Sequence, residues 1–212
     1  MQAEARADAP RLIAILRGLA PERAAEVGAA LYEAGIREVE VPLNSPEPYR
    51  SIATLASRTG WTVGAGTVLS AADVGRAREA GARLIVAPNC EPVVIRRALG
   101  LGLEVMPGIA TATEAFSAIT AGARHLKLFP AASYGPRHLE ALRAVLPPDV
   151  RVYPVGGIGT ADLAPWLAAG AAGFGLGSEL YRPGYTVEEI AHRARALVCA
   201  LAGSVPAKDT GA

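Results

Sequence analysis

The chain has 212 residues, about half of them hydrophobic, and 21 basic and 20 acidic residues that leave a formal net charge of +1. This length suits one compact α/β domain with a sizeable buried core. Charges of both signs are interspersed, which argues against a nucleic-acid partner, and no apolar run approaches the roughly 18 residues that cross a membrane. With only two cysteines, Cys90 and Cys199, and no apolar leader at residues 1–10, we expect reduced thiols and a cytoplasmic location.

A pattern repeats along the chain, in which a helix-ending Ala-Gly pair is followed by a short apolar strand. It occurs four times, and each interval is about twice the length of one strand–helix unit, so a further strand is expected in every gap. In chain order we expect strands at 12–16, 38–41, 62–65, 84–87, 104–106, 126–129, 151–155 and 174–176.

The helices between these strands carry recognisable start and stop signals. Glycine ends a helix because it adopts the left-handed conformation without steric cost. The starts are a proline, or a hydroxyl residue with an acidic residue three positions on: Pro21, Ser70 with Asp73, Thr111 with Glu114, and Pro136. Regular β-α alternation predicts a parallel sheet, and eight units favour a single-domain (β/α)8 TIM barrel at 12–202, with an N-terminal extension at 1–11 and a frayed tail at 203–212.

In such a barrel, functional residues lie at the carboxyl ends of the strands and in the loops that follow. Arg17 follows the first strand, Glu40 lies at the end of the second, Thr67 follows the third, and Lys127 lies in the sixth. Strand alternation puts Arg17, Thr67 and Lys127 on the same face as alternate residues of their strands. If those faces turn inward, the polar groups converge at the barrel mouth.

Lys127 lies in the otherwise apolar stretch 126–129, and two interpretations are open. It is either a structural lysine, paired with a carboxylate or extended to solvent, or a nucleophile whose pKa is lowered by burial so that a neutral amine attacks a ketone. Glu40 lies between two valines, and a structural and a catalytic interpretation are open for it as well. It can form an ion pair with Lys127 or Arg17, and it can serve as a general acid–base for a lysine adduct, and the two roles are compatible.

Two glycine loops follow the last two strands, where barrels often bind phosphate. These are Gly156-Gly157 and Gly177-Ser178, and a short helix is expected to start at about 179–181 and direct its N–H groups at an anion. The three histidines show no ligand spacing, so the sequence predicts no metal site.

Six segments of the chain form a recognisable combination: LIAILRG at 12–18, VEVPLNSP at 39–46, GAGTV at 64–68, PGIATATEAF at 107–116, LKLFP at 126–130 and VGGI at 155–158. Together they resemble the 2-keto-3-deoxy-6-phosphogluconate / 6-phosphogalactonate aldolases, over residues 12–181. The resemblance implies a homotrimer that performs class I retro-aldol cleavage to pyruvate and D-glyceraldehyde 3-phosphate, without a cofactor or metal.

The resemblance also implies residue roles. Lys127 would form the Schiff base and Glu40 would be the acid–base, while Arg17 and Thr67 would hold the keto-acid end of the substrate. The phosphate would be held by residues of the two glycine loops, namely Gly156, Gly157, Gly177 and Ser178.

Within the resembling family, two features favour 2-dehydro-3-deoxy-6-phospho-D-galactonate as the substrate. One is the Pro-Leu-Asn-Ser-Pro loop after Glu40, and the other is Val155, where gluconate aldolases typically carry threonine. Alternatives are cleavage of the phosphogluconate derivative or of 4-hydroxy-2-oxoglutarate, a phosphosugar epimerase or isomerase barrel, and a non-catalytic phosphosugar-binding module. Lys127 and Glu40 argue against the last, because a pure binder gains little from a buried amine.

Overall fold

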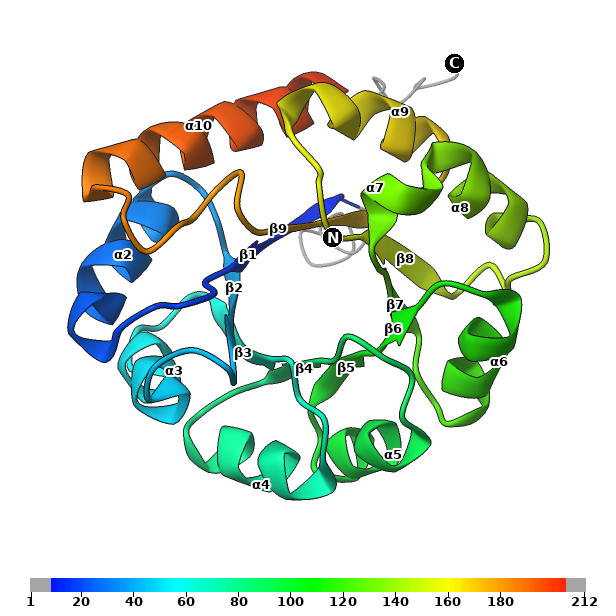
Figure 1. The fold of residues 1–212 in the computed structure, drawn as a ribbon, viewed down its shortest axis with the longest axis horizontal. Helices are drawn as coiled ribbons and strands as arrows, with labels where there is room; N and C mark the ends of the chain where they lie inside the picture. Colours follow the sequence, from blue (N-terminus) through cyan, green and yellow to red (C-terminus); the bar gives the residue numbers. More distant parts are fainter. Residues whose placement is uncertain (1–8, 205–212) are drawn as a thin grey trace, which may run out of the picture.

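The computed structural model describes residues 9–204, which form an α/β fold with a curled parallel sheet inside a ring of helices (Figure 1). Each of the eight predicted strands is present to within a residue or two, and the fifth continues past Pro107 as an additional short strand. The strands are β1 (Arg11–Ile15), β2 (Glu38–Pro42), β3 (Thr62–Gly66), β4 (Leu84–Val86), β5 (Glu104–Met106), β6 (Gly108–Ile109), β7 (His125–Leu128), β8 (Arg151–Pro154) and β9 (Gly173–Leu176).

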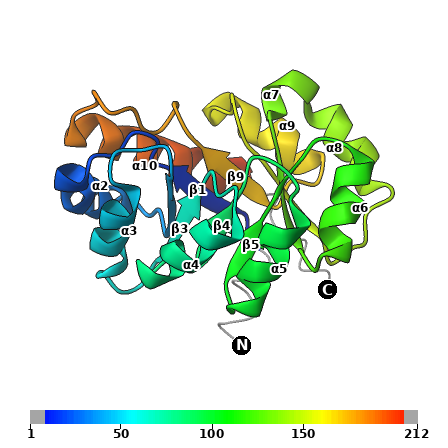
Figure 2. The same cartoon turned by 60° about the horizontal axis from the view of Figure 1, so that its bottom comes forward.

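Helices cover the outer face of the sheet, as the tilted view in Figure 2 also shows. They are α2 (Pro21–Glu33), α3 (Pro48–Ala56), α4 (Ala71–Glu79), α5 (Pro92–Gly100), α6 (Ala112–Thr120), α7 (Ala131–Tyr134), α8 (Pro136–Arg143), the 3-10 helix η1 (Thr160–Asp162), α9 (Leu163–Ala168) and α10 (Val187–Ser204). Within residues 9–204, no helix combines the length and the apolar character needed to span a bilayer.

The predicted helix signals are confirmed. Prolines occupy the first positions of α2 and α8, Ser70 caps α4, and Thr111 and Glu114 form a capping box on α6. The glycines that follow α2, α4, α6 and α9 have φ between 93° and 106°, the left-handed conformation that favours glycine.

The sheet consists of two hydrogen-bonded pieces, ordered β5-β4-β3-β2-β1-β9 and β6-β7-β8, with all pairings parallel. One seam lies at Pro107, which lacks the N–H that a continuous ladder requires, although its carbonyl accepts from the Lys127 N–H at 2.9 Å. At the other seam, Val155 forms an isolated bridge with Gly175, and the Ala172 N–H donates to the Val152 carbonyl at 2.9 Å. The parallel sheet is therefore curled, and its two hydrogen-bonded pieces do not form one uninterrupted ladder.

Two of the predicted boundaries shift. β1 begins at Arg11, inside the expected N-terminal extension, and α10 continues through Ser204, inside the expected tail. The rest of those predicted ends, residues 1–8 and 205–212, lies outside the described residues.

The space enclosed by the strands is filled in layers. A buried apolar layer crosses its middle and is formed by Ile13, Leu84, Val86, Met106 and Tyr153. The larger apolar core lies on the other face of the strands, against the helices. Such an apolar layer excludes water from the polar side chains that lie next to it, and those side chains are therefore partly desolvated.

On β3, the face that was considered as inward from the sequence turns outward. Val63 and Ala65, which alternate along the strand toward Thr67, pack in the outer core against the helices. The inward positions are Gly64 and Gly66, because a Cβ there would meet Leu84 of the inner layer or the Glu40 carboxylate. Alternation ends after the strand, where Thr67 takes the left-handed conformation at φ 55°.

Candidate active site

Among residues 9–204, Lys127 and Glu40 are the two charged residues that are buried, with exposed fractions of 5% and 2%. Lys127 is the third of the four residues of β7, and Glu40 is the third of the five residues of β2. The Glu40 Oε2 atom has no hydrogen-bond partner, and the Lys127 Nζ lies 4.8 Å from the centre of the Phe129 ring. The ion pair considered for them from the sequence does not form, since no salt bridge involves either residue within the part of the chain that the structure describes.

Burial brings the pKa values of Glu40 and Lys127 closer together. Desolvation raises the pKa of Glu40 to about 7, and the positive charges of Lys127 and Arg17 oppose that rise. Desolvation also lowers the pKa of Lys127, against the attraction of Glu40 and with the help of repulsion from Arg17. Both shifts favour the neutral forms, a carboxyl for Glu40 and a free amine for Lys127.

A glycine makes the position of Glu40 possible. Gly66 is the partner in register of Pro42 on the neighbouring strand, and a Cβ built on it would overlap the Glu40 carboxylate. Any side chain at this position would therefore displace the carboxylate. The sequence shows Gly66 plainly, but only the register of β2 and β3 reveals what it accommodates.

A cavity of about 140 Å³ adjoins Lys127 at the ends of β1, β7, β8 and β9. It brings together seven of the nine predicted site residues: Arg17, Lys127, Val155, Gly156, Gly157, Gly177 and Ser178. Glu40 lies behind the lining and acts on Lys127 and Arg17 through its charge, whereas Thr67 is half-buried and outside the lining. Larger hollows, of about 540 and 1220 Å³, lie along α10 and at the amino ends of the strands, and neither contains Lys127 or Glu40.

The two glycine loops form one end of this cavity. Gly156 and Gly157 have φ of 98° and 72°, so both adopt a conformation that other residues avoid. The short helix expected at 179–181 is absent. Residues 178–180 form a turn, in which the Leu180 and Tyr181 N–H groups both donate to the Gly177 carbonyl at 2.9 Å. Backbone groups of a turn, rather than a helix dipole, are what this loop offers to an anion.

Arg17 lies at the mouth of the cavity and contacts a residue that the sequence did not single out. Its Nη1 donates to Oδ1 of Asn44 at 2.7 Å. Phe129 and Glu179, which also line the cavity, were likewise not predicted as site residues. Phe129 directly follows β7, two positions after Lys127, and that spacing is the signal that could have identified it.

Metal ligands do not gather anywhere in the described part of the chain, where no three His, Cys, Asp or Glu side chains come together in a group able to hold an ion. The buried amine of Lys127 and the buried carboxyl of Glu40 offer a nucleophile and an acid–base next to a glycine-lined pocket.

Residues 3–193 match the family model described as KDPG and KHG aldolase. The chain belongs to this family. It is therefore an aldolase, an enzyme of the carbon–carbon lyase class. The family assignment agrees with the resemblance that the sequence motifs carry.

Comparison with individual proteins gives more detail than the family match. The chain is 51% identical over 190 residues to the 2-dehydro-3-deoxy-6-phosphogalactonate aldolase of Escherichia coli (strain K12), covering 88% of this chain and 92% of the relative. A 2-dehydro-3-deoxy-phosphogluconate aldolase of Pseudomonas aeruginosa is 37% identical over 141 residues, or 66% of this chain and 64% of that protein. A solved structure described as "Native KDPGal structure" superposes with a TM-score of 0.90 at 48% identity, covering 91% of this chain and 95% of that one.

Proposed function

We propose that this aldolase cleaves 2-dehydro-3-deoxy-6-phospho-D-galactonate to pyruvate and D-glyceraldehyde 3-phosphate by a class I, Schiff-base mechanism. The observation that carries the proposal is that Lys127 and Glu40 are both buried and interact through their charges without forming an ion pair. Burial shifts the pKa of each group in the direction that favours its neutral form. The identity to the galactonate relative, 51% against 37% for the gluconate relative, supports the choice of substrate.

In the proposed mechanism, the neutral amine of Lys127 adds to the C2 ketone and loss of water leaves a protonated imine. Glu40, as the carboxylate, accepts the proton of the C4 hydroxyl, directly or through a water. The C3–C4 bond then breaks, its electron pair moves into the imine to give an enamine, and the aldehyde product departs. Protonation of C3 and hydrolysis release pyruvate and return the free amine.

The two ends of the substrate carry negative charge and are proposed to meet different groups. Arg17 and Thr67 would hold the carboxylate of the keto acid, Arg17 through its guanidinium at the cavity mouth. The backbone N–H groups of Gly156, Gly157, Gly177 and Ser178 would hold the phosphate at the opposite end. No step of this scheme uses a cofactor.

Val155 is proposed to select between the C4 epimers. Its side chain lies against Gly175 and close to Ile15, so the wall of the cavity between Lys127 and the glycine loops is apolar. A threonine here would present a hydroxyl to the substrate, and sites that bind a single hydroxyl discriminate between epimers. Val155→Thr should therefore change the ratio of kcat/KM for the galactonate and gluconate epimers, and an unchanged ratio would remove Val155 from the account of specificity.

Trapping tests the nucleophile directly. Pyruvate and borohydride should leave a reduced adduct on Lys127, found by mass spectrometry of the digested protein, and Lys127→Met should prevent both labelling and cleavage. Labelling at another lysine, or full activity of Lys127→Met, would overturn the mechanism. The same sample of wild-type enzyme, assayed with both epimers, tests the substrate independently of the nucleophile.

Two features of assembly stay proposals. The contacts at the two seams of the sheet support a closed (β/α)8 barrel, and family resemblance supports a homotrimer. Light scattering after size-exclusion chromatography should give three times the 21.8 kDa of one chain.

A cytoplasmic location is proposed from the two free cysteines, Cys90 and Cys199, and can be tested by fractionation.

A further inference from the structure

The guanidinium of Arg17 is held by a neutral side-chain amide. Other arginines donate either to backbone carbonyls, as Arg37, Arg143, Arg182 and Arg193 do, or to carboxylates. Arg11, Arg23, Arg50, Arg76 and Arg124 each form an ion pair with a carboxylate. Among residues 9–204, Arg17 has no carboxylate within ion-pair distance, and its hydrogen-bond partner is the neutral amide oxygen of Asn44. A neutral acceptor fixes one nitrogen of the guanidinium and leaves its full charge and remaining donors unpaired.

The neighbour of Asn44 holds the backbone of the same loop. Ser45 is 7% exposed, and its Oγ accepts the Gly18 N–H at 2.9 Å. Gly18 has φ 80°, and a Cβ there would come within 2.8 Å of the Pro183 side chain, so the loop after β1 is confined on both sides. The Ser45 N–H donates to the Pro42 carbonyl at 2.9 Å, which makes a turn directly after the strand that carries Glu40.

We propose that Asn44 and Ser45 form a clamp that positions Arg17 for the carboxylate of the keto acid, with Asn44 as a neutral acceptor that leaves the charge of Arg17 to the substrate. The inference rests on the proposed function, and it makes Asn44 and Ser45 positioning residues that act through Arg17. It also gives the Pro-Leu-Asn-Ser-Pro loop a physical role: one turn links the strand of the acid–base to the arginine that binds the substrate.

Pyruvate is the probe that tests this clamp, because it carries the carboxylate and the ketone but no phosphate. The measurement is the pyruvate concentration that half-saturates borohydride trapping on Lys127. In Asn44→Asp, the new carboxylate forms an ion pair with Arg17 and competes with pyruvate, so this concentration should rise about tenfold. The adduct yield at saturating pyruvate should be kept, because Lys127 and Glu40 are unchanged. Asn44→Ala, which frees the guanidinium without neutralising it, should give a smaller rise.

Two controls separate the clamp from a general effect of charge or of folding. Asn89→Asp adds the same charge at the end of β4, at an exposed asparagine that has no hydrogen bond to Arg17, and should shift pyruvate saturation much less. In an Arg17→Met background, Asn44→Asp should add no more than Asn89→Asp does. A structural role for Asn44 would instead lower the melting temperature and leave pyruvate saturation unmoved.

The outcomes distinguish this inference from the proposed function. If wild-type enzyme forms no pyruvate adduct on Lys127, the proposed function fails. If the adduct forms and Asn44→Asp saturates at the wild-type concentration, or shifts equally without Arg17, the clamp is overturned. A shift confined to the phosphorylated substrate would also overturn it, because Arg17 would then serve the phosphate.

Discussion

The burial of Glu40 has a direct consequence for the proposed proton transfer. It is 2% exposed, its Oε2 has no hydrogen-bond partner, and burial raises its pKa to about 7. A carboxyl group in ordinary solution would be fully ionised at that pH, so it would be a weak proton donor. Near pH 7 both forms of Glu40 are populated, which is what a group that first accepts and later returns a proton requires.

The rate of cleavage should follow this titration. Because the carboxylate form accepts the C4 hydroxyl proton, kcat/KM of the wild type should rise with pH through about 7. Glu40→Gln cannot accept the proton, and its kcat should fall by about 10²–10⁴-fold with the rise near pH 7 abolished. The check is a pH–rate profile of both proteins at subsaturating substrate. A variant that keeps the wild-type inflection would assign the titration to another group.

The same shift makes Glu40 a cost to stability at alkaline pH. Its pKa is higher in the folded chain than the ordinary 4.5, so the contribution to stability is fully present below about pH 4.5 and is lost as the pH rises through about 7. Glu40→Gln should therefore raise the free energy of unfolding at pH 8, by at most about 3 kcal/mol, and leave it nearly unchanged at pH 5. Urea unfolding at the two pH values measures the difference, and an equal effect at both would contradict the sign argued here.

Gly66 offers a test of the space that Glu40 occupies. Gly66→Ala places a methyl group where the carboxylate lies, so the carboxylate must move, and we expect about 1–3 kcal/mol of destabilisation and at least a tenfold fall in kcat. Gly75→Ala is the matched control, because Gly75 lies within α4 and a Cβ there comes no closer than 3.9 Å to Arg97. That control should be stabilised by about 1 kcal/mol with unchanged kcat, as measured by thermal unfolding and initial rates.

At the scale of elements, the repeat predicted the strands and helices well because each signal is local. An Ala-Gly pair ends a helix and a capping residue begins one whatever the rest of the chain does, so these predictions are confirmed at α2, α4, α6 and α8. The orientation of β3 is not a local property. Val63 and Ala65 are apolar and could fill either layer, and the choice depends on Glu40 of the neighbouring strand needing the room that Gly66 leaves.

The loop after β9 shows the same limit. Residues 179–181 follow a glycine and precede a helix, as a phosphate-binding helix turn would, and the sequence therefore predicts one. The chain instead forms an isolated turn closed on the Gly177 carbonyl, and α10 begins only at Val187. Pro183 and Gly184 lie between the two, which prevents the turn from continuing as a helix.

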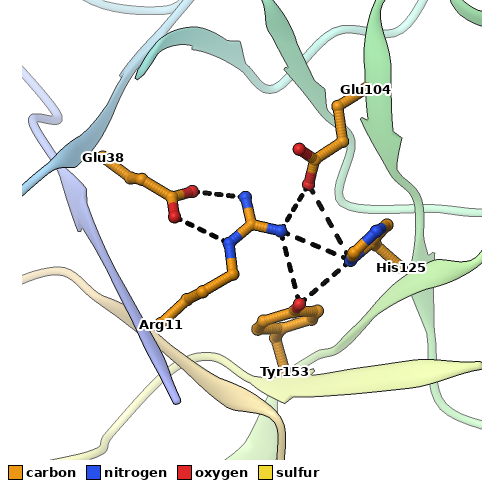
Figure 3. A network of polar contacts seen from close by, with 5 residues as sticks. All are labelled: Arg11, Glu38, Glu104, His125 and Tyr153. Carbon is orange, nitrogen blue, oxygen red and sulfur yellow. Dashed lines mark hydrogen bonds and ion pairs between the residues drawn. The ribbon is translucent and has the colours of Figure 1, made fainter. Parts of the chain in front are cut away.

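At the scale of the whole molecule, a cluster of polar residues lies at the amino ends of the strands, opposite the candidate active site at their carboxyl ends. Figure 3 shows Arg11 surrounded by Glu38, Glu104, His125 and Tyr153. Arg11 pairs with both carboxylates, and the Tyr153 hydroxyl lies 2.9 Å from Nδ1 of His125. These residues come from β1, β2, β5, β7 and β8, so the network joins both hydrogen-bonded pieces of the sheet. Arg11, Glu38, Glu104 and His125 are the first residues of their strands and Tyr153 is the third of β8, and only the fold brings them to one guanidinium.

This network should stabilise the curled sheet without taking part in catalysis, because none of its five residues lines the cavity beside Lys127. Arg11→Met leaves Glu38 and Glu104 without their guanidinium, and we expect the free energy of unfolding to fall by about 2–3 kcal/mol, the lower part of the range for buried pairs because Arg11 is 20% exposed. Urea unfolding at pH 8 is the measurement, with kcat expected near the wild-type value.

Two further variants decide what the loss in Arg11→Met means. Arg124 forms an ion pair with Asp149, and their side chains are 48% and 63% exposed. Arg124→Met breaks this exposed pair and should change the free energy of unfolding by less than about 0.5 kcal/mol. Adding Glu38→Gln to Arg11→Met removes one uncompensated carboxylate and should recover part of the lost stability, because the cost arises from desolvated charge rather than from missing contacts. A double variant that is less stable than Arg11→Met alone would show instead that the network acts through packing, and the two pieces of the sheet would then be joined by the apolar layer.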